Sequence, residues 1–100
     1  FRQVMTTNIV DRVAVIKALA HPTRLRIAEL LAKKTSCVGE LHQQIAGDLS
    51  TVSKHLTVMR EAGWLTCQKT GLHIYYSLAC NCLDDFLCCV DSLSTNSNCS

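Results

Sequence analysis

Thiol groups crowd the last part of this sequence. Five of its seven cysteines follow residue 79; Cys88 and Cys89 are neighbours, and Cys80 and Cys82 are one residue apart. Thiolates are soft ligands that prefer soft metals, and paired thiols can also be oxidised to a disulfide. The first residues lack the apolar centre of a signal peptide, so we expect a cytoplasmic protein. In that reducing compartment, clustered thiols bind a soft metal or respond to oxidants.

A second set of polar groups lies between residues 49 and 65. The apolar residues of this stretch recur at helical spacing, and Gly63 ends the pattern. The opposite face of the predicted helix is short, polar and partly basic, which suits contact with phosphates and base edges in a DNA groove. An ordinary amphipathic surface helix would show the same pattern. The residues expected to meet DNA here are Ser50, Thr51, Ser53, Lys54, His55 and Thr57.

The charge is divided along the chain. Residues 1–70 contain all ten Lys and Arg against five Asp and Glu, a net charge of +5. Residues 71–100 contain three acidic residues and no Lys or Arg, a net charge of −3. The first part is therefore suited to a polyanion and the last part is not.

One hundred residues, of which 48% are hydrophobic, suffice for a single domain over 1–100. No apolar run approaches the roughly 20 residues that cross a bilayer, so we expect no membrane partner. Hydrophobic spacing predicts a helix over 7–19, a second from Pro22 to Lys34, and a short third helix capped by Ser36 and ended by Gly47. The fourth helix, capped by Ser50, then completes a helix-turn-helix in which it is the reading helix.

After Gly63 the pattern changes from helical spacing to alternation. Strands are predicted over 64–68 and 72–78 with a turn over 69–71, followed by a last helix over 79–93 and a flexible tail over 94–100. A hairpin after a helix-turn-helix is a wing, and its tip is expected near the DNA backbone or minor groove. The tip residues are Gln68, Lys69, Thr70 and His73. The predicted fold is mainly α with a β-hairpin wing (α+β), a winged helix-turn-helix of order α-α-α-α-β-β-α.

The first and last predicted helices keep apolar surface that one small domain does not cover. A homodimer built on these two helices would bury it. Two-fold symmetry would then present two reading helices to half-sites about one DNA turn apart.

Three segments resemble the ArsR/SmtB family of winged-helix bacterial repressors, which sense metals, metalloids or reactive sulfur. They are residues 18–27 (ALAHPTRLRI), residues 50–63 (STVSKHLTVMREAG), and Gly71 with the YYSL run at 75–78. The resemblance implies a homodimer that binds double-stranded operator DNA without inducer and releases it when the inducer binds. It implies a regulator, not an enzyme.

Sensor positions of the family are only partly matched. One family site has a Cys-Val-Cys pattern, and the corresponding run 37–39 keeps only Cys37. Another has an Asp-x-His pair on the last helix, where this sequence has Cys80 and Cys82. The answering positions of the partner, near Leu93 and Asn96, supply no ligand, so a conventional zinc site is not expected.

Trivalent arsenic or antimony binds about three thiolates. Cys88 and Cys89 supply two of them, and Cys99 could fold back as the third. At 1.5 Å per residue, Cys80 and Cys82 lie about 10 Å from this pair, nearer the start of the same predicted helix. They could join the site across an antiparallel helix pair. We therefore expect arsenite or antimonite as inducer, no constitutive cofactor, and these metalloid ligands: Cys88, Cys89, Cys99, Cys80 and Cys82.

Two other interpretations stay open. The same repressor could respond to reactive sulfur or oxidants through a disulfide or polysulfide link. A small thiol enzyme or metal buffer would need a base beside a nucleophile, and the nearest pair, Cys67 and His73, is six residues apart. No serine–histidine–acid or phosphate-loop pattern occurs, so we expect no enzyme. Cys67 is instead expected to pack as a small apolar residue of a strand.

Overall fold

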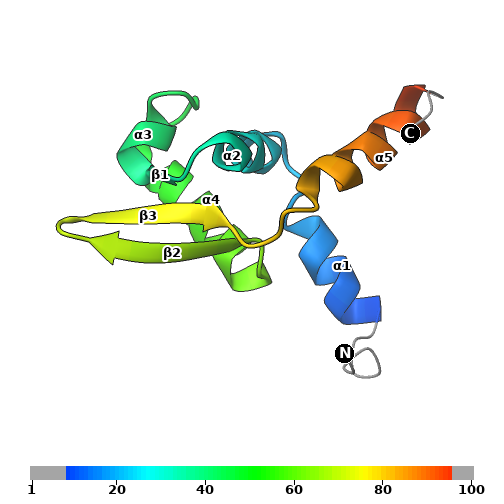
Figure 1. Ribbon diagram of the computed structural model, residues 1–100, viewed down its shortest axis with the longest axis horizontal. Helices are drawn as coiled ribbons and strands as arrows, with labels where there is room; N and C mark the ends of the chain where they lie inside the picture. The colour runs from blue at the N-terminus through cyan, green and yellow to red at the C-terminus, as the bar shows by residue number, and fades with distance from the viewer. Residues whose placement is uncertain (1–8, 96–100) are drawn as a thin grey trace.

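The computed structural model describes residues 9–95 (Figure 1). Within them the elements follow in the order α1 (Ile9–Lys17), α2 (Pro22–Lys33), β1 (Ser36–Cys37), α3 (Val38–His42), α4 (Leu49–Ala62), β2 (Leu65–Thr70), β3 (His73–Leu78) and α5 (Leu83–Thr95). The predicted winged helix-turn-helix, mainly α with a β-hairpin, is confirmed. The structure adds one strand, β1, that the sequence pattern did not predict.

The three strands form one antiparallel sheet in the order β1-β3-β2. The wing is the β2–β3 pair, which runs from Leu65 opposite Leu78 to Thr70 opposite His73. The short β1 pairs Cys37 with Tyr75 and so attaches the start of α3 to the wing. Two residues are too few to show the alternation by which a strand is predicted.

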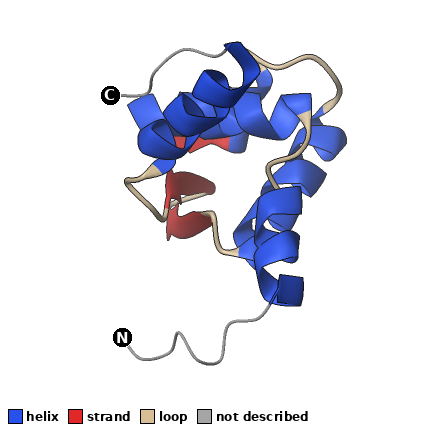
Figure 2. Ribbon diagram, turned by 90° about the vertical axis from the view of Figure 1, so that its right-hand side faces the viewer, coloured by secondary structure: helices blue, strands red, loops and turns tan. Residues whose placement is uncertain are grey.

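The core lies between α2, α3 and α4 and is closed by β2 and the start of α5. Its fully buried side chains include Ile27 on α2, Leu56 and Met59 on α4, and Leu83 on α5. By contrast, α1 has no buried residue. Both α1 and α5 leave the core at the end opposite the wing tip (Figure 1) and diverge from one another (Figure 2). No helix among the described residues is long and apolar enough to span a bilayer.

The reading helix α4 is capped two residues earlier than predicted. Asp48, not Ser50, is its N-cap: the Thr51 amide donates to Asp48 Oδ1 over 2.8 Å. The Ser50 hydroxyl donates to the same oxygen over 3.1 Å. A carboxylate is preferred here because it accepts several donors and faces the positive end of the helix dipole.

The third helix also differs from its prediction. Cys37 is its N-cap, and its amide donates to Glu40 Oε1 over 3.0 Å. Ser36, the predicted cap, belongs to β1 instead. The helix ends at His42, well before Gly47, where the chain adopts a positive φ of 114°.

The wing turn starts two residues later than predicted and ends one residue later. Thr70 pairs with His73, so the turn is Gly71-Leu72, and Gly71 has the positive φ of 64° that such a turn favours. Leu72, predicted on the apolar face of its strand, is 95% exposed at the tip.

The last helix starts later than predicted, at Leu83 instead of residue 79, because a disulfide between Cys80 and Cys82 holds the preceding residues in a turn. It ends at Thr95, so residues 94 and 95 belong to the helix and not to the tail. Residues 7 and 8 of the predicted first helix, and 96–100 of the predicted tail, lie outside the described residues.

Candidate nucleic-acid interface and thiol sites

Helix α4 has one buried face and one exposed face. Val52, Leu56 and Met59 are 0% exposed, which fixes the rotation of the helix about its axis. The hydroxyl of Thr57 donates to the Ser53 carbonyl over 3.1 Å, so its oxygen remains available as an acceptor at the surface. The exposed polar residues of this face are Ser50, Thr51, Lys54 and Thr57, with Ser53 half-buried beside them.

His55 is half-buried and turns towards α2 rather than lying with Lys54 on the outer face. The Arg24 Nε donates to His55 Nδ1 over 3.1 Å, and the His21 and His55 ring centroids are 4.6 Å apart. His21 is itself the N-cap of α2, its Nδ1 accepting from the Thr23 amide over 3.0 Å. Both imidazoles must therefore be unprotonated at Nδ1.

The electrostatics agree with a neutral His55. Burial lowers the pKa of His55 below its ordinary value of 6.5, and three nearby basic groups act in the same direction: His21, Arg24 and Lys54. His55, predicted as a DNA contact, thus holds α2 against α4, and it positions the reading helix from behind.

The wing presents all four predicted tip residues to solvent. Lys69 on β2 and His73 on β3 are exposed on either side of the Gly71-Leu72 turn. No Asp or Glu occurs between Ala62 and Leu83, so the whole hairpin is free of carboxylates. Its charge suits a phosphate backbone.

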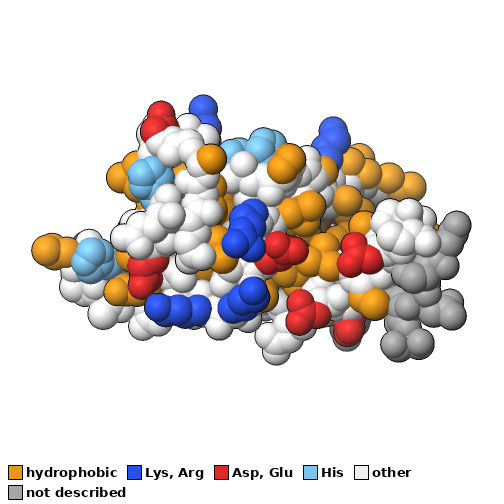
Figure 3. All heavy atoms as spheres, turned by 90° about the horizontal axis from the view of Figure 1, so that it is seen from above, with side chains coloured by type: hydrophobic (Ala, Val, Ile, Leu, Met, Phe, Trp, Pro, Cys, Tyr) orange, Lys and Arg blue, Asp and Glu red, His pale blue; other side chains and the backbone are white. Residues whose placement is uncertain are grey.

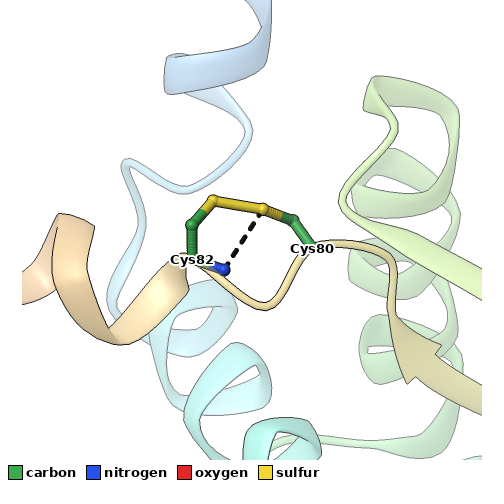
Figure 4. Close-up of a disulfide and its surroundings, with 2 residues drawn as sticks. All are labelled: Cys80 and Cys82. Atoms are coloured by element: carbon green, nitrogen blue, oxygen red, sulfur yellow. Dashed lines mark hydrogen bonds between the residues drawn. A yellow bond between two sulfur atoms is a disulfide. The ribbon is translucent and has the colours of Figure 1, made fainter.

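Cys80 and Cys82 form a disulfide in the connection between β3 and α5 (Figure 4). The Cys82 amide also donates to Cys80 Sγ over 3.3 Å. An open cleft of about 240 Å³ lies beside Cys80, between the end of α2 and the start of α5. The prediction that both cysteines lie on the last helix is therefore wrong; they precede it.

The predicted five-thiol set is not assembled within the described residues. On α5, Cys88 is half-buried and disulfide-bonded, whereas Cys89 is an exposed thiol; Cys99 lies outside the described part. Between residues 9 and 95, no three His, Cys, Asp or Glu side chains are close enough to hold a metal ion. Cys67, predicted to pack in its strand, is exposed on β2, whereas Cys37 is buried.

Sequence reasoning missed Trp64, which it treated only as the start of a strand. Its indole Nε1 donates to the Val15 carbonyl of α1 over 2.8 Å. Its ring faces Phe86 of α5 at 6.3 Å between centroids, and its carbonyl accepts from the Ala79 amide over 2.8 Å. Trp64 is the sole tryptophan of the chain and directly follows Gly63. Its position directly after the glycine that ends the reading helix was the signal by which the sequence could have identified it.

An apolar surface remains on the helices that leave the core. On α1, Ile9 is 75% and Ile16 is 53% exposed, and on α5, Leu93 is 84% exposed. Figure 3 shows apolar side chains gathered over the α5 half of the face that it views. A shallow apolar groove, lined by Ile16, Phe86 and Val90 among others, joins the two helices.

Comparison with known proteins gives consistent results. A helix-turn-helix domain model matches residues 19–68. The HTH-type transcriptional regulator Rv0081 of Mycobacterium tuberculosis is 42% identical over 64 residues, 63% of this chain and 56% of that protein. Its crystal structure covers 90% of this chain and 93% of its own, with a TM-score of 0.76 at 29% identity.

Two further matches are informative. A transcriptional repressor SmtB homolog of Synechocystis is 38% identical over 64 residues, 64% of this chain and 48% of that protein. The homodimeric winged helix-turn-helix domain of a possible ArsR-family regulator from Mycobacterium bovis has a TM-score of 0.75 at 26% identity, covering 86% of this chain and 80% of its own. The match thus spans about half the length of these curated relatives.

The lowered pKa of His55 predicts a pH dependence of stability. Because the unfolded chain binds the proton more readily, stability is fully present above pH 6.5 and falls as the pH drops below it. We expect the thermal midpoint to decrease as the pH is lowered from about 7.5 to about 5.5, and to decrease less in His55→Gln. Glu40 and Asp48 also have lowered pKa values. These carboxyls reduce stability only when the pH drops below their ordinary pKa values of 4.5 and 3.8.

The matched control is His73→Gln, which changes an exposed histidine of the wing and should keep the wild-type profile. Thermal scans followed by circular dichroism measure all three proteins. Identical profiles for wild type and His55→Gln would show that this imidazole is not the group responsible.

Proposed function

The chain belongs to the ArsR/SmtB family of winged helix-turn-helix transcriptional regulators, and from that premise we propose that it is a dimeric repressor that binds operator DNA in the cytoplasm. The observation that carries the proposal is the division of α4 into a fully buried apolar face and an exposed face of hydroxyls with one cation. The major groove admits a helix of this kind.

In this proposal, α4 lies in the major groove and the wing reaches the flanking backbone. Ser50, Thr51 and Thr57 offer hydroxyls that donate to or accept from base edges and phosphates. Lys54 and Lys69 offer cations for phosphates, and no carboxylate of the hairpin opposes them. Because only two lysines of these elements are involved, most of the affinity must come from two copies acting together.

The apolar faces of α1 and α5 supply the dimer interface of the proposal. Ile9, Ile16 and Leu93 are each more than half exposed in the single chain, which is costly for aliphatic side chains that share one end of the molecule. The M. bovis neighbour is a homodimer of the same fold. Pairing through these helices would hold two α4 helices at a fixed spacing on the operator.

The proposed signal acts through the C-terminal thiols and releases the DNA. The Cys80–Cys82 bond favours a response to oxidants or reactive sulfur, because a two-electron change at this pair needs no further ligand. The metalloid response remains a second candidate. It rests on the adjacent Cys88 and Cys89. Cys88 is disulfide-bonded in this structure and would first have to be reduced, and Cys99, or thiols of a second copy, would have to be added.

Lys54 tests the DNA interface. We expect Lys54→Ala to weaken binding several-fold on every duplex and to lower the slope of log K against log salt by about 2, because each protomer of the dimer loses one phosphate contact. Fluorescence anisotropy with a duplex that the reduced protein selects from a random library measures both effects. The control is Arg26→Ala, whose side chain pairs with Glu29 over 3.8 Å on the solvent side of α2. A wild-type affinity that does not depend on salt would contradict the proposal.

Ile16 tests the dimer. We expect Ile16→Asp to sediment as a monomer and to lose most of its operator affinity, because a charge in the apolar face of α1 opposes pairing. Circular dichroism should show an unchanged fold, since Ile16 is 53% exposed in the single chain. Ile74→Asp, a charge on the wing at a residue 44% exposed, should remain dimeric in sedimentation. A dimeric Ile16→Asp would contradict the assignment of the interface.

The two signals can be separated on one protein. Hydrogen peroxide should release wild type with a loss of two hydrogen atoms from the peptide that contains Cys80 and Cys82, and dithiothreitol should reverse both. Cys80→Ser should bind DNA and ignore the oxidant, whereas Cys67→Ser should behave as wild type. If arsenite released the DNA without a loss of hydrogen from the Cys80–Cys82 peptide, and if Cys88→Ser abolished that release, the metalloid response would be favoured instead. Release of Cys80→Ser by peroxide would contradict the disulfide.

A further inference from the structure

Both ends of the Cys80–Cys82 turn are connected to Trp64, one directly and the other through Phe86. The Ala79 amide, directly before Cys80, donates to the Trp64 carbonyl over 2.8 Å. On the other side, the Cys82 carbonyl accepts from the Phe86 amide over 3.0 Å, and the Phe86 ring lies 6.3 Å from the Trp64 ring. A change in the shape of this turn therefore reaches both the backbone and the side chain of Trp64.

Trp64 is equally attached to the reading helix. It follows Gly63, the left-handed C-cap of α4 with φ 100°, and its amide donates to the Met59 carbonyl over 3.0 Å. The Met59 side chain is fully buried against the core. On α1, the Val15 carbonyl accepts from the indole Nε1. Trp64 thus touches the end of α4 and both helices of the proposed dimer interface.

We propose that Trp64 is the positioning residue through which the redox state of Cys80 and Cys82 sets the placement of α4, an inference that rests on the proposed function. The oxidant is hydrogen peroxide. One thiol attacks it to give a sulfenic acid and water, and the second thiol displaces a second water to form the disulfide. A dithiol reductant returns both hydrogen atoms. The cleft beside Cys80 gives small reagents access to the pair.

The turn has two arrangements available to it. The disulfide closes residues 80–82, and α5 begins at Leu83. In the dithiol form, the hydrophobic spacing of 79–93 favours a helix that begins about one turn earlier. That change moves Ala79 and Phe86 relative to Trp64. Coupling requires such a two-state element, whose equilibrium both sites bias.

The test substitutes Trp64→Phe, which keeps a ring against Phe86 and removes the N–H that Val15 accepts. In wild type, we expect the operator Kd of the oxidised form to exceed that of the reduced form by about 5–150-fold, and in Trp64→Phe by about twofold or less. The variant should still form the disulfide, as mass spectrometry shows, and should bind DNA normally when reduced. Tyr76→Phe, an aromatic change in β3 away from the turn, should keep the wild-type ratio.

A second measurement needs no variant of Trp64. Because the chain has one tryptophan, its emission and its quenching by acrylamide report on Trp64 alone. Both should change during a dithiothreitol titration with the midpoint of the DNA affinity change, and neither should change in Cys80→Ser. An unchanged emission, or a full redox ratio in Trp64→Phe, overturns the inference while operator binding stands. Absence of salt-sensitive DNA binding in wild type overturns the proposed function itself.

Discussion

The burial of one face of α4 is the constraint on which the rest of the molecule depends. Val52, Leu56 and Met59 are completely covered, and burial of three such side chains is worth about 5–9 kcal/mol. A rotation of the helix by one residue would expose them, so the rotation that presents Lys54 and Thr57 to solvent is set by the core. His55 adds to this constraint from the side, where Arg24 and His21 hold it against α2. Recognition at the surface is thus fixed by packing behind it.

The two ends of α4 are held by different means. At its start, Asp48 accepts from the Thr51 amide and the Ser50 hydroxyl, a local arrangement that depends on neighbouring residues only. At its end, Gly63 turns the chain so that Trp64 meets α1 and α5, which are distant in sequence. The position of the start of the reading helix therefore depends on local contacts alone, whereas the position of its end depends on where α1 and α5 lie.

Much of this organisation could be predicted from the sequence, because it rests on spacing. The helical period of the α4 core residues and the alternation from Ile74 to Leu78 identify the elements and their order. One boundary that was wrong depends on a partner far along the chain: Ser36 pairs with Tyr76, so it joins a strand and does not cap a helix. Cys80 and Cys82 delay α5 by bonding to one another, and no periodicity reveals that bond. The contacts of Trp64 could not be predicted either, because periodicity does not reveal them.

The state of α1 links the two proposals. This helix has no buried residue, so its place relative to the core rests on contacts outside its own apolar face, among them the bond from Trp64 to Val15. In a dimer, the same helix would be clamped by the partner, and any shift of Trp64 would then have to move α4 instead of α1. Dimerisation would therefore allow the contact between Trp64 and Val15 to displace the reading helix. In a single chain the same shift of Trp64 would move α1 instead of α4, because no partner holds α1.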